Sequence, residues 1–225
     1  MKIIAVSDLH GNLVDIHDSC DVFIIAGDWS PLNIQWSYKD VIEWIDSSFM
    51  PWLLSINAHH YVFIPGNHDI VCTSSRFLKD FSSILNKYHA KHIVHYLNRT
   101  SVTIMHKKIY GIPDCEMTQT HWAFTKIGNI DWSFDNDTDI LITHQPPKLS
   151  KVATVDWYGR DFGSIDLLNR LKKSHVQLNI CGHIHEGEHG KHSLARLDGS
   201  TDVYNVSLLD EEYKVRYAPT IIDLD

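Results

Sequence analysis

Short apolar runs that stop abruptly at aspartate, asparagine or histidine are the feature that most constrains the fold of this chain. The first run, Lys2–Ser7, is rich in β-branched residues, which suits a strand buried on both faces of a sheet. It ends at Asp8 and His10, and Gly11 then permits a sharp turn. A carboxylate and an imidazole therefore lie close together where a buried strand gives way to a loop. Together they offer hard oxygen and borderline nitrogen, which suit a first-row divalent metal.

Four further junctions repeat this arrangement. The runs 22–26, 61–64, 139–143 and 176–181 are apolar, and each is followed by residue types that bind metals. The residues that follow the four runs are, in chain order, Asp28, Asn67 with His68, His144, and His183 with His185. Ligands of α/β proteins gather beyond the carboxyl ends of strands. A single aspartate in a turn or a single surface histidine is ordinary, but five junctions of one kind predict a shared site.

The remaining periodicity predicts helices between the strands. Apolar spacing indicates helices over 38–49, where Pro51 should end or kink the helix, over 74–88 with Ser74 as cap, and over 164–173. A helical turn is expected in 12–18 and a helix from Thr118 or Thr120 to 127. The runs 93–97, 102–105 and 108–112 predict antiparallel strands, and 203–224 predicts two or three β segments. Strands alternating with helices predict an α/β sandwich of two sheets, and no linker or repeat divides residues 1–225, so we expect one domain.

Composition limits the classes of function. The 225 residues carry a net charge of −8, which disfavours binding to long nucleic acid or to an anionic membrane. No apolar run approaches the ~20 residues that span a bilayer, and the short amino-terminal run ending at Asp8 does not suit a signal peptide. Cys20, Cys72, Cys115 and Cys181 are widely spaced without a Cys-x-x-Cys pair, so we expect reduced thiols and a cytoplasmic protein.

The number of candidate ligands indicates two metal ions. The candidate ligands are the junction residues other than His68. These seven side chains are too many for one four-coordinate zinc, but they suit two cations that share a carboxylate. Two ions roughly 3.5–4 Å apart can hold the attacking and leaving oxygens of an in-line displacement at phosphorus. A water that bridges them becomes a hydroxide nucleophile near neutral pH, so no serine or cysteine nucleophile is required. Ligands of the Asp, Asn and His types, without thiolate, suit manganese, with iron, zinc, cobalt, nickel or magnesium as alternatives.

The motifs resemble those of the calcineurin-like metallophosphoesterase superfamily. They are, in chain order, Asp8-x-His10, Gly27-Asp28, Gly66-Asn67-His68-Asp69, His144 and Gly182-His183-x-His185. The resemblance implies an α/β fold, namely a four-layer α/β/β/α sandwich with two central mixed β-sheets. It also implies that Asp8, His10 and His185 hold one metal and that Asn67, His144 and His183 hold the other. Asp28 would bridge the two metals.

The same resemblance implies catalytic roles beside the metals. His68 would protonate the leaving oxygen or stabilise the transition state, and Asp69 would orient the His68 imidazole. The segments Thr143–Pro147, Gly182–Gly187 and Asn205–Ser207 resemble the small metallophosphoesterase-domain branch, which is associated with phosphodiesterase activity, including on cyclic nucleotides. Asn205 is then expected to reach the site from its far side.

One departure from the superfamily favours a diester substrate. The protein phosphatases of the superfamily carry an Asp-Arg-Gly motif just after the bridging aspartate, whereas Asp28 is followed here by Trp29-Ser30-Pro31, without an arginine. A phosphomonoester dianion favours arginine clamps, and only Arg160, with Arg76 more remote, is placed to reach the cleft. Trp29, Trp36 and Trp157 are expected either to stack a base or to pack loops. We therefore expect a small phosphodiester substrate, with a phosphomonoesterase or nuclease as the alternative and a non-catalytic scaffold as a third; the sequence does not predict the oligomeric state.

Overall fold

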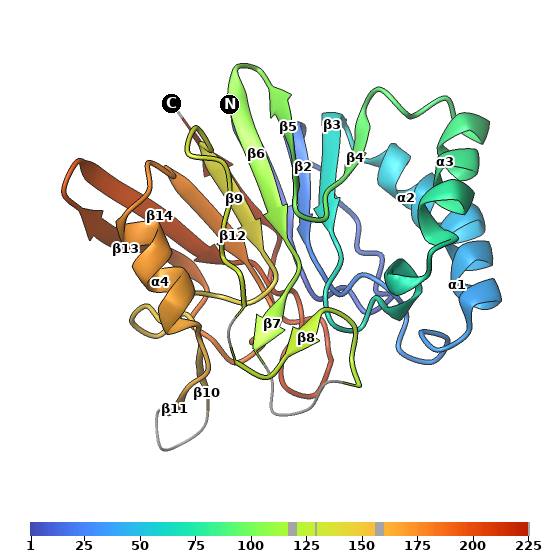
Figure 1. The fold of residues 1–225 in the computed structure, drawn as a ribbon. Coiled ribbons are helices and arrows are strands. Elements are labelled where there is room, and N and C mark those ends of the chain that lie inside the picture. Colours follow the sequence, from blue (N-terminus) through green and yellow to red (C-terminus); the bar gives the residue numbers. More distant parts are fainter. Residues whose placement is uncertain (117–120, 129, 156–159, 225) are drawn as a thin grey trace.

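Two mixed sheets form the centre of the molecule in this computed structural model, which describes residues 1–116, 121–128, 130–155 and 160–224 (Figure 1). The first sheet has the strand order β15 (Thr220–Asp223), β1 (Lys2–Val6), β2 (Cys20–Ala26), β3 (Ala58–Ile64) and β4 (Val94–Tyr96). The second has the order β13 (Gly190–Arg196), β14 (Gly199–Asn205), β12 (Leu178–Cys181), β9 (Ile140–Thr143), β6 (Lys107–Ile112) and β5 (Thr100–Ile104). Parallel strands form the middle of each sheet. The edge strands β15, β13 and β5 pair antiparallel, whereas β4, at the other edge of the first sheet, pairs parallel.

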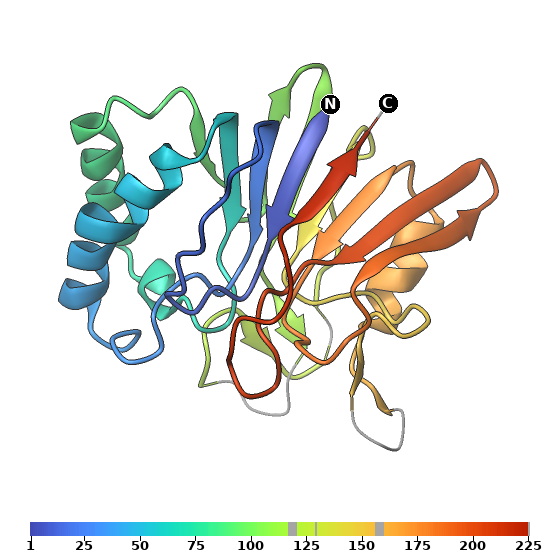
Figure 2. The same cartoon turned by 180° about the vertical axis from the view of Figure 1, so that it is seen from behind.

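Helices cover the outer face of each sheet. On the first sheet these are α1 (Tyr38–Trp44), the π-helix η1 (Ile45–Phe49), α2 (Met50–Ser55) and α3 (Phe77–Lys87), and on the second it is α4 (Ile165–Lys172) (Figures 1 and 2). Shorter elements are the 3-10 helix η2 (Ile70–Thr73) and the pairs β7 (Cys115–Glu116) with β8 (Thr125–Lys126) and β10 (Thr154–Val155) with β11 (Arg160–Asp161). The expected four-layer α/β/β/α sandwich with two central mixed sheets is confirmed.

Burial on both faces explains the unbroken apolar runs of the strands. In β1, Ile3 and Ala5 pack into the layer between the sheets, whereas Ile4 and Val6 pack against the helices. A strand with two buried faces loses the alternation of a half-exposed strand. Beyond the end of β1, Ser7 forms a parallel bridge with Ser207 of the other half of the chain, with its amide donating to Val206 O at 2.8 Å. The two sheets are thereby joined one residue before Asp8.

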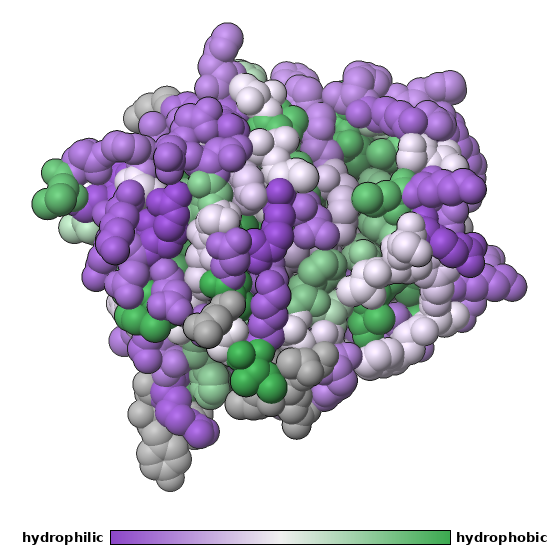
Figure 3. Space-filling model, in the orientation of Figure 1, coloured by the Kyte–Doolittle hydropathy of each residue, from purple (hydrophilic) through white to green (hydrophobic). Residues whose placement is uncertain are grey.

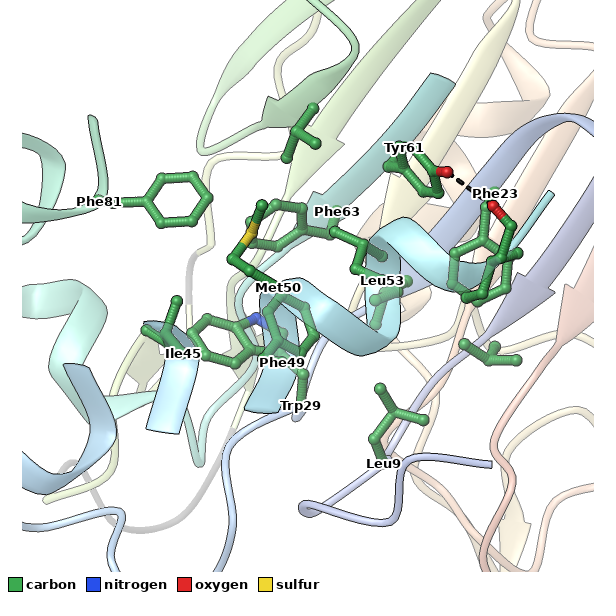
Figure 4. Close-up of a cluster of buried hydrophobic side chains, with 14 of the residues drawn as sticks. Leu9, Phe23, Trp29, Ile45, Phe49, Met50, Leu53, Tyr61, Phe63 and Phe81 are labelled. Carbon is green, nitrogen blue, oxygen red and sulfur yellow. Dashed lines mark hydrogen bonds between the residues drawn. The ribbon is translucent and has the colours of Figure 1, made fainter. Parts of the chain in front are cut away.

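Aromatic side chains dominate the core between the first sheet and its helices (Figure 4). Trp29 is only 1% exposed, stacks on Phe49 with ring centroids 5.2 Å apart and meets Phe63 edge-on at 5.9 Å. Of its two expected roles, Trp29 therefore has the packing role. The Trp29 ring therefore anchors the loop that carries Asp28. Each aromatic pair of this kind contributes about 0.5–1.5 kcal/mol of stability beyond the effect of burying its area.

Several local expectations were wrong, each for an identifiable reason. Residues 12–18 form no helix, and the segment 93–97 contributes β4, which pairs parallel with β3. The helix that starts at Tyr38 continues past Pro51, because the π-helical turn before α2 places this proline at a helix start, where its missing N–H costs nothing. Residues 121–127 contain β8 instead of a helix, and 117–120 lie outside the described residues.

Of the two predicted helix caps, Ser164 is confirmed and Ser74 is wrong, because α3 begins only at Phe77 after Arg76. Ser164 caps α4 by accepting from Leu167 N at 3.2 Å, as predicted from its position before an apolar periodic run. Among the described residues, no helix has both the length and the apolar character that crossing a bilayer demands. The face in Figure 3 accordingly mixes hydrophilic side chains with separate hydrophobic areas.

Candidate metal centre

The five junctions meet at the carboxyl ends of the central strands, below the sheets as drawn in Figure 1. Asp28 lies between two imidazoles: its Oδ2 is 3.2 Å from His144 Nε2 and 3.9 Å from His10 Nε2. Asp8 Oδ1 is 3.6 Å from His185 Nε2. Asn67 Oδ1 is 3.1 Å from His144 Nε2, and the His183 ring lies 5.0 Å from the His144 ring. All seven candidate ligands are thus brought together by loops distant in the chain; Asp8 and His183, for example, are 175 residues apart.

Strained backbone conformations place several of these side chains. Asp8, His10, Asp28 and His183 all have positive φ, between 43° and 69°. This region is unfavourable for residues with a Cβ and persists where the surroundings hold it, often at functional sites. Here the surroundings are backbone hydrogen bonds, such as Asp8 N to Gly27 O at 3.0 Å and His10 N to Asp28 O at 2.9 Å.

Two glycines of the motifs are required by close approach. A Cβ at Gly66 would lie 2.6 Å from His144 Nε2, and a Cβ at Gly182 would lie 2.5 Å from Asp8 Oδ2. Real Cβ contacts are longer than this, so any larger residue would displace a candidate ligand. The absence of a side chain at Gly182 also lets His183 N donate to Asp8 Oδ2 at 2.9 Å, which fixes the carboxylate.

The electrostatics of the cluster suit cations. Burial alone would raise the pKa of Asp8 and Asp28, but His185 beside Asp8 and His144 beside Asp28 hold both pKa values far below the usual range. In return, the carboxylates outweigh the effect of burial and raise the pKa of His144 and of His185 to about 9. Positive charge is therefore favoured at both of these positions, where a bound metal would replace a proton.

In the described part of the chain, three triads of side chains have ligand atoms within 4.8 Å of one another and could hold a metal ion. They are Asp8 with His10 and His185, Asp8 with Asp28 and His144, and Cys115 with His144 and His183. The oxygen and nitrogen donors of the first two triads suit first-row divalent cations. The donor chemistry therefore fits the two-metal expectation, and the third triad adds a thiol that the sequence analysis left out.

His68 lies beside the cluster and is held from two sides. Its backbone N donates to Asp28 Oδ1 at 2.7 Å, and its Nδ1 donates to Gln35 Oε1 at 2.9 Å. Gln35 thus occupies the place expected of Asp69. The Asp69 carboxylate instead accepts from the backbone amides of Gly66 (2.7 Å), Ser30 (2.9 Å) and Trp29 (3.4 Å). These amides tie the Asp28 loop to the Asn67 loop, so the contacts of Asp69 are with the backbone that carries the ligands.

A cavity of about 290 Å³ lies next to the candidate ligands. It is lined by five candidate ligands, by His68 and by two aromatic residues, namely His10, Asp28, Asn67, His183, His185, His68, Trp122 and Tyr213. The Trp122 ring lies 4.4 Å from the His68 ring, and the Tyr213 ring lies 5.1 Å from both the His10 and the His185 rings. The sequence analysis missed both aromatics, because 121–127 read as a helix and the segment with Tyr213 carries no motif.

The remaining predicted site residues differ in their placement. Trp36 is 61% exposed, and its ring lies 5.5 Å from the ring of Trp122, which lines the cavity. Asn205 donates its amide to Ile184 O at 2.7 Å, so it supports the loop between His183 and His185 from behind. Arg160 lies 5.8 Å from the Phe162 ring and is not among the described residues that line the cavity. Trp157 lies outside the described residues.

Comparison with known proteins assigns the family. The family model of calcineurin-like phosphoesterases matches residues 1–187, and the chain therefore belongs to this family and is a metal-dependent phosphoesterase. The human metallophosphoesterase domain-containing protein 1 is 28% identical, over 99% of this chain and 71% of that protein.

Solved structures share the fold at low identity. Phosphopantetheinyl hydrolase from Mycobacterium tuberculosis has a TM-score of 0.54 at 12% identity, covering 94% of this chain and 90% of its own. The protein TT1561 of Thermus thermophilus has a TM-score of 0.52 at 11% identity, covering 97% of this chain and 98% of its own.

Proposed function

We propose that this chain is a dinuclear-metal phosphodiesterase that hydrolyses a small diester, such as a cyclic nucleotide or a nucleotide-like molecule. The observation that carries the proposal is the position of the Asp28 carboxylate, whose Oδ2 is within 4 Å of imidazoles from both halves of the cluster. A shared carboxylate is what two neighbouring cations require. Asp8, His10 and His185 would hold one cation and Asn67, His144 and His183 the other, with manganese as the expected metal.

The bound cations would supply an activated water and would polarise the phosphoryl oxygens. The chain's own residues then position the substrate and move a proton. His68 lines the cavity, and its Nδ1 is hydrogen-bonded to Gln35. Its Nε2 is therefore the atom that would donate a proton to the leaving oxygen. Burial lowers the pKa of His68, so its imidazolium is a stronger acid but the minor form near neutral pH. Asp69 acts here as a positioning residue, because it holds the loops of Asp28 and Asn67 in register.

The charge of the cavity supports a diester over a monoester. Among the described residues that line it, none is arginine or lysine. A diester carries a single charge, whereas a monoester dianion gains more from a bidentate arginine clamp. Trp122 and Trp36 extend from His68 toward solvent and offer a stacking surface for an aromatic group on the leaving side.

Two wider proposals accompany the reaction. Residues 1–225 would form one domain, which is supported by the pairing of β15 with β1 at opposite ends of the chain (Figure 2). A cytoplasmic location is supported by the four buried cysteines, which are all free thiols.

Substrate preference tests the proposal directly. The purified protein with added Mn²⁺ is expected to hydrolyse bis-p-nitrophenyl phosphate faster than p-nitrophenyl phosphate, measured by release of nitrophenol. A preference for the monoester would replace the proposal with a phosphomonoesterase, and cleavage of long nucleic acid in preference to both would indicate a nuclease. No turnover together with no bound metal by elemental analysis would indicate a non-catalytic scaffold.

A further inference from the structure

Cys115 differs in its surroundings from the other three cysteines. Cys20 and Cys72 belong to the hydrophobic core between the first sheet and its helices, and Cys181 packs with Val152 and Val203. Cys115 is fully buried but belongs to none of the hydrophobic clusters that the described residues form. Its Sγ instead lies within 4.8 Å of ligand nitrogens of His144 and His183, and its hydrogen bond to Pro113 O is long at 3.8 Å.

The segment that carries Cys115 is built into the site. Cys115 N donates to Phe124 O at 3.0 Å, and Glu116 N donates to the side chain of Gln145 at 2.8 Å, next to His144. Ala123 N, in the turn just before β8, donates to Asn67 O at 3.1 Å. The thiol is therefore fixed by the same loops that carry the candidate ligands Asn67 and His144.

We propose that Cys115 is a thiolate ligand of the cation held by Asn67, His144 and His183, and that this half of the centre therefore selects a softer metal than the other. This inference rests on the proposed two-metal function. Without Cys115, the donors of this cation are neutral apart from the shared Asp28, whereas the other cation also has Asp8. A thiolate supplies a second negative charge, and sulfur ligands favour zinc, cobalt or cadmium over manganese or magnesium.

Binding in this way requires loss of one proton. The S–H bond of Cys115 breaks as the bond from sulfur to metal forms, and the proton passes to the buffer, so the oxidation state of sulfur and metal is unchanged. The first half, with Asp8, His10 and His185, offers only oxygen and nitrogen. When two different metals compete for the centre, the harder cation should therefore bind on the Asp8 side.

Cobalt spectroscopy tests the ligand without relying on turnover. Metal-free protein is titrated anaerobically with Co²⁺, and the wild type is expected to bind two equivalents and to develop a near-ultraviolet band of sulfur-to-cobalt charge transfer. Cys115→Ser is expected to lose that band while its visible cobalt bands remain, and to bind the second equivalent at least about tenfold more weakly. Cys20→Ser is the matched control, because Cys20 lies at the opposite end of β2 from Asp28, and it is expected to keep the band.

The outcomes separate this inference from the proposed function. Two bound cobalt ions and diester hydrolysis without a sulfur band would overturn the role of Cys115 and leave the phosphodiesterase proposal intact. Retention of the band in Cys115→Ser would also overturn it. Binding of fewer than two cobalt ions would overturn both. If Cys115→Ser does not fold, ¹¹³Cd NMR of the wild type decides: one of two resonances is expected far downfield from sulfur ligation, and two similar resonances would contradict the inference.

Discussion

The two halves of the candidate metal centre are built in different ways. Asp28 and His144 are deeply buried, and His144 donates its Nδ1 to Ala26 O of β2 at 2.8 Å. His185 belongs to the other half and donates its Nδ1 to Asp210 O at 2.9 Å, in the exposed turn that also carries Tyr213. The His144 ring is held directly by a strand of the first sheet, whereas in the other half Asp8 and His10 are buried but the His185 ring depends on a loop near the cavity mouth. Metal binding and fold stability should therefore be coupled more tightly in the half that contains His144.

The largest effect is expected where the two halves share a ligand. Asp28→Ala should lose both metal ions and reduce kcat/KM by about 10³-fold or more, because metal ions contribute several kcal/mol of transition-state stabilisation. Elemental analysis and bis-p-nitrophenyl phosphate hydrolysis measure the two losses. Retention of one tightly bound ion would show that the two halves bind metal independently, and would contradict the role of Asp28 as a shared ligand.

His68→Ala should affect the chemistry without affecting either half. His68 contacts Asp28 through its backbone N, which the substitution keeps, so both metals should stay bound. Loss of general acid catalysis is expected to lower kcat by about 10²–10³-fold. Gln35→Ala should lower kcat by less, and should shift the pH profile of kcat, because the imidazole remains but loses its partner. A fully active His68→Ala variant would remove His68 from the mechanism.

Stability of the metal-free protein separates the halves directly. His144→Ala should lower the free energy of unfolding by about 3 kcal/mol, because it leaves the buried Asp28 carboxylate without its cationic partner. Burial lowers the pKa of His10 to about 4, so this ring is neutral and its removal should cost only about 1 kcal/mol. Urea unfolding in the presence of a chelator measures both. Equal losses would contradict the distinction between the two halves.

A pH dependence of the metal-free protein follows from the same ion pairs. His144 and His185 have folded pKa values of about 9, above the ordinary value of 6.5. Their stabilising contribution is therefore complete below pH 6.5 and is lost as the pH rises through 9. The Tm of the chelator-treated protein should fall over this window, whereas metal-loaded protein should show a flatter profile, since the metal replaces the protons. A Tm that rises over the window in the metal-free protein would contradict the assigned pairing.

The smallest effect is expected at Trp36, whose ring lies beside the cavity residue Trp122. Trp36→Ala should raise KM for bis-p-nitrophenyl phosphate roughly fivefold, from loss of about 1 kcal/mol of stacking, with a smaller change in kcat. Trp36→Phe should retain most of the affinity. Leu78→Ala, an exposed residue on α3 away from the cavity, is the control and should have no effect. A change in kcat alone would exclude a stacking role.

The part of the site that the sequence predicted is the part encoded locally. Asp8, Asp28 and His144 each follow an apolar run, and the carboxyl ends of parallel strands meet at one edge, so their convergence follows from the strand pattern. Gln35, Trp122 and Tyr213 reach the cavity only through loops whose paths depend on tertiary contacts, and no local pattern indicates them. From its sequence, Cys115 is predicted only to be a reduced thiol.

The same distinction applies to the fold. The central strands were predictable because burial on both faces leaves a distinctive apolar run. The path of residues 93–97 was not predictable. Within this stretch, β4 pairs with β3 of the first sheet, whereas β5, only a few residues further on, belongs to the second sheet. The sheet that a short strand joins depends on pairing with distant parts of the chain, and the sequence of the strand itself does not indicate that pairing.

The central claim is that one carboxylate serves two cations, and a crystal structure of the protein grown with Mn²⁺ tests it most directly. Anomalous scattering should show two peaks roughly 3.5–4 Å apart, with a carboxylate oxygen of Asp28 contacting both. A single peak, or two peaks of which Asp28 contacts only one, would contradict the account.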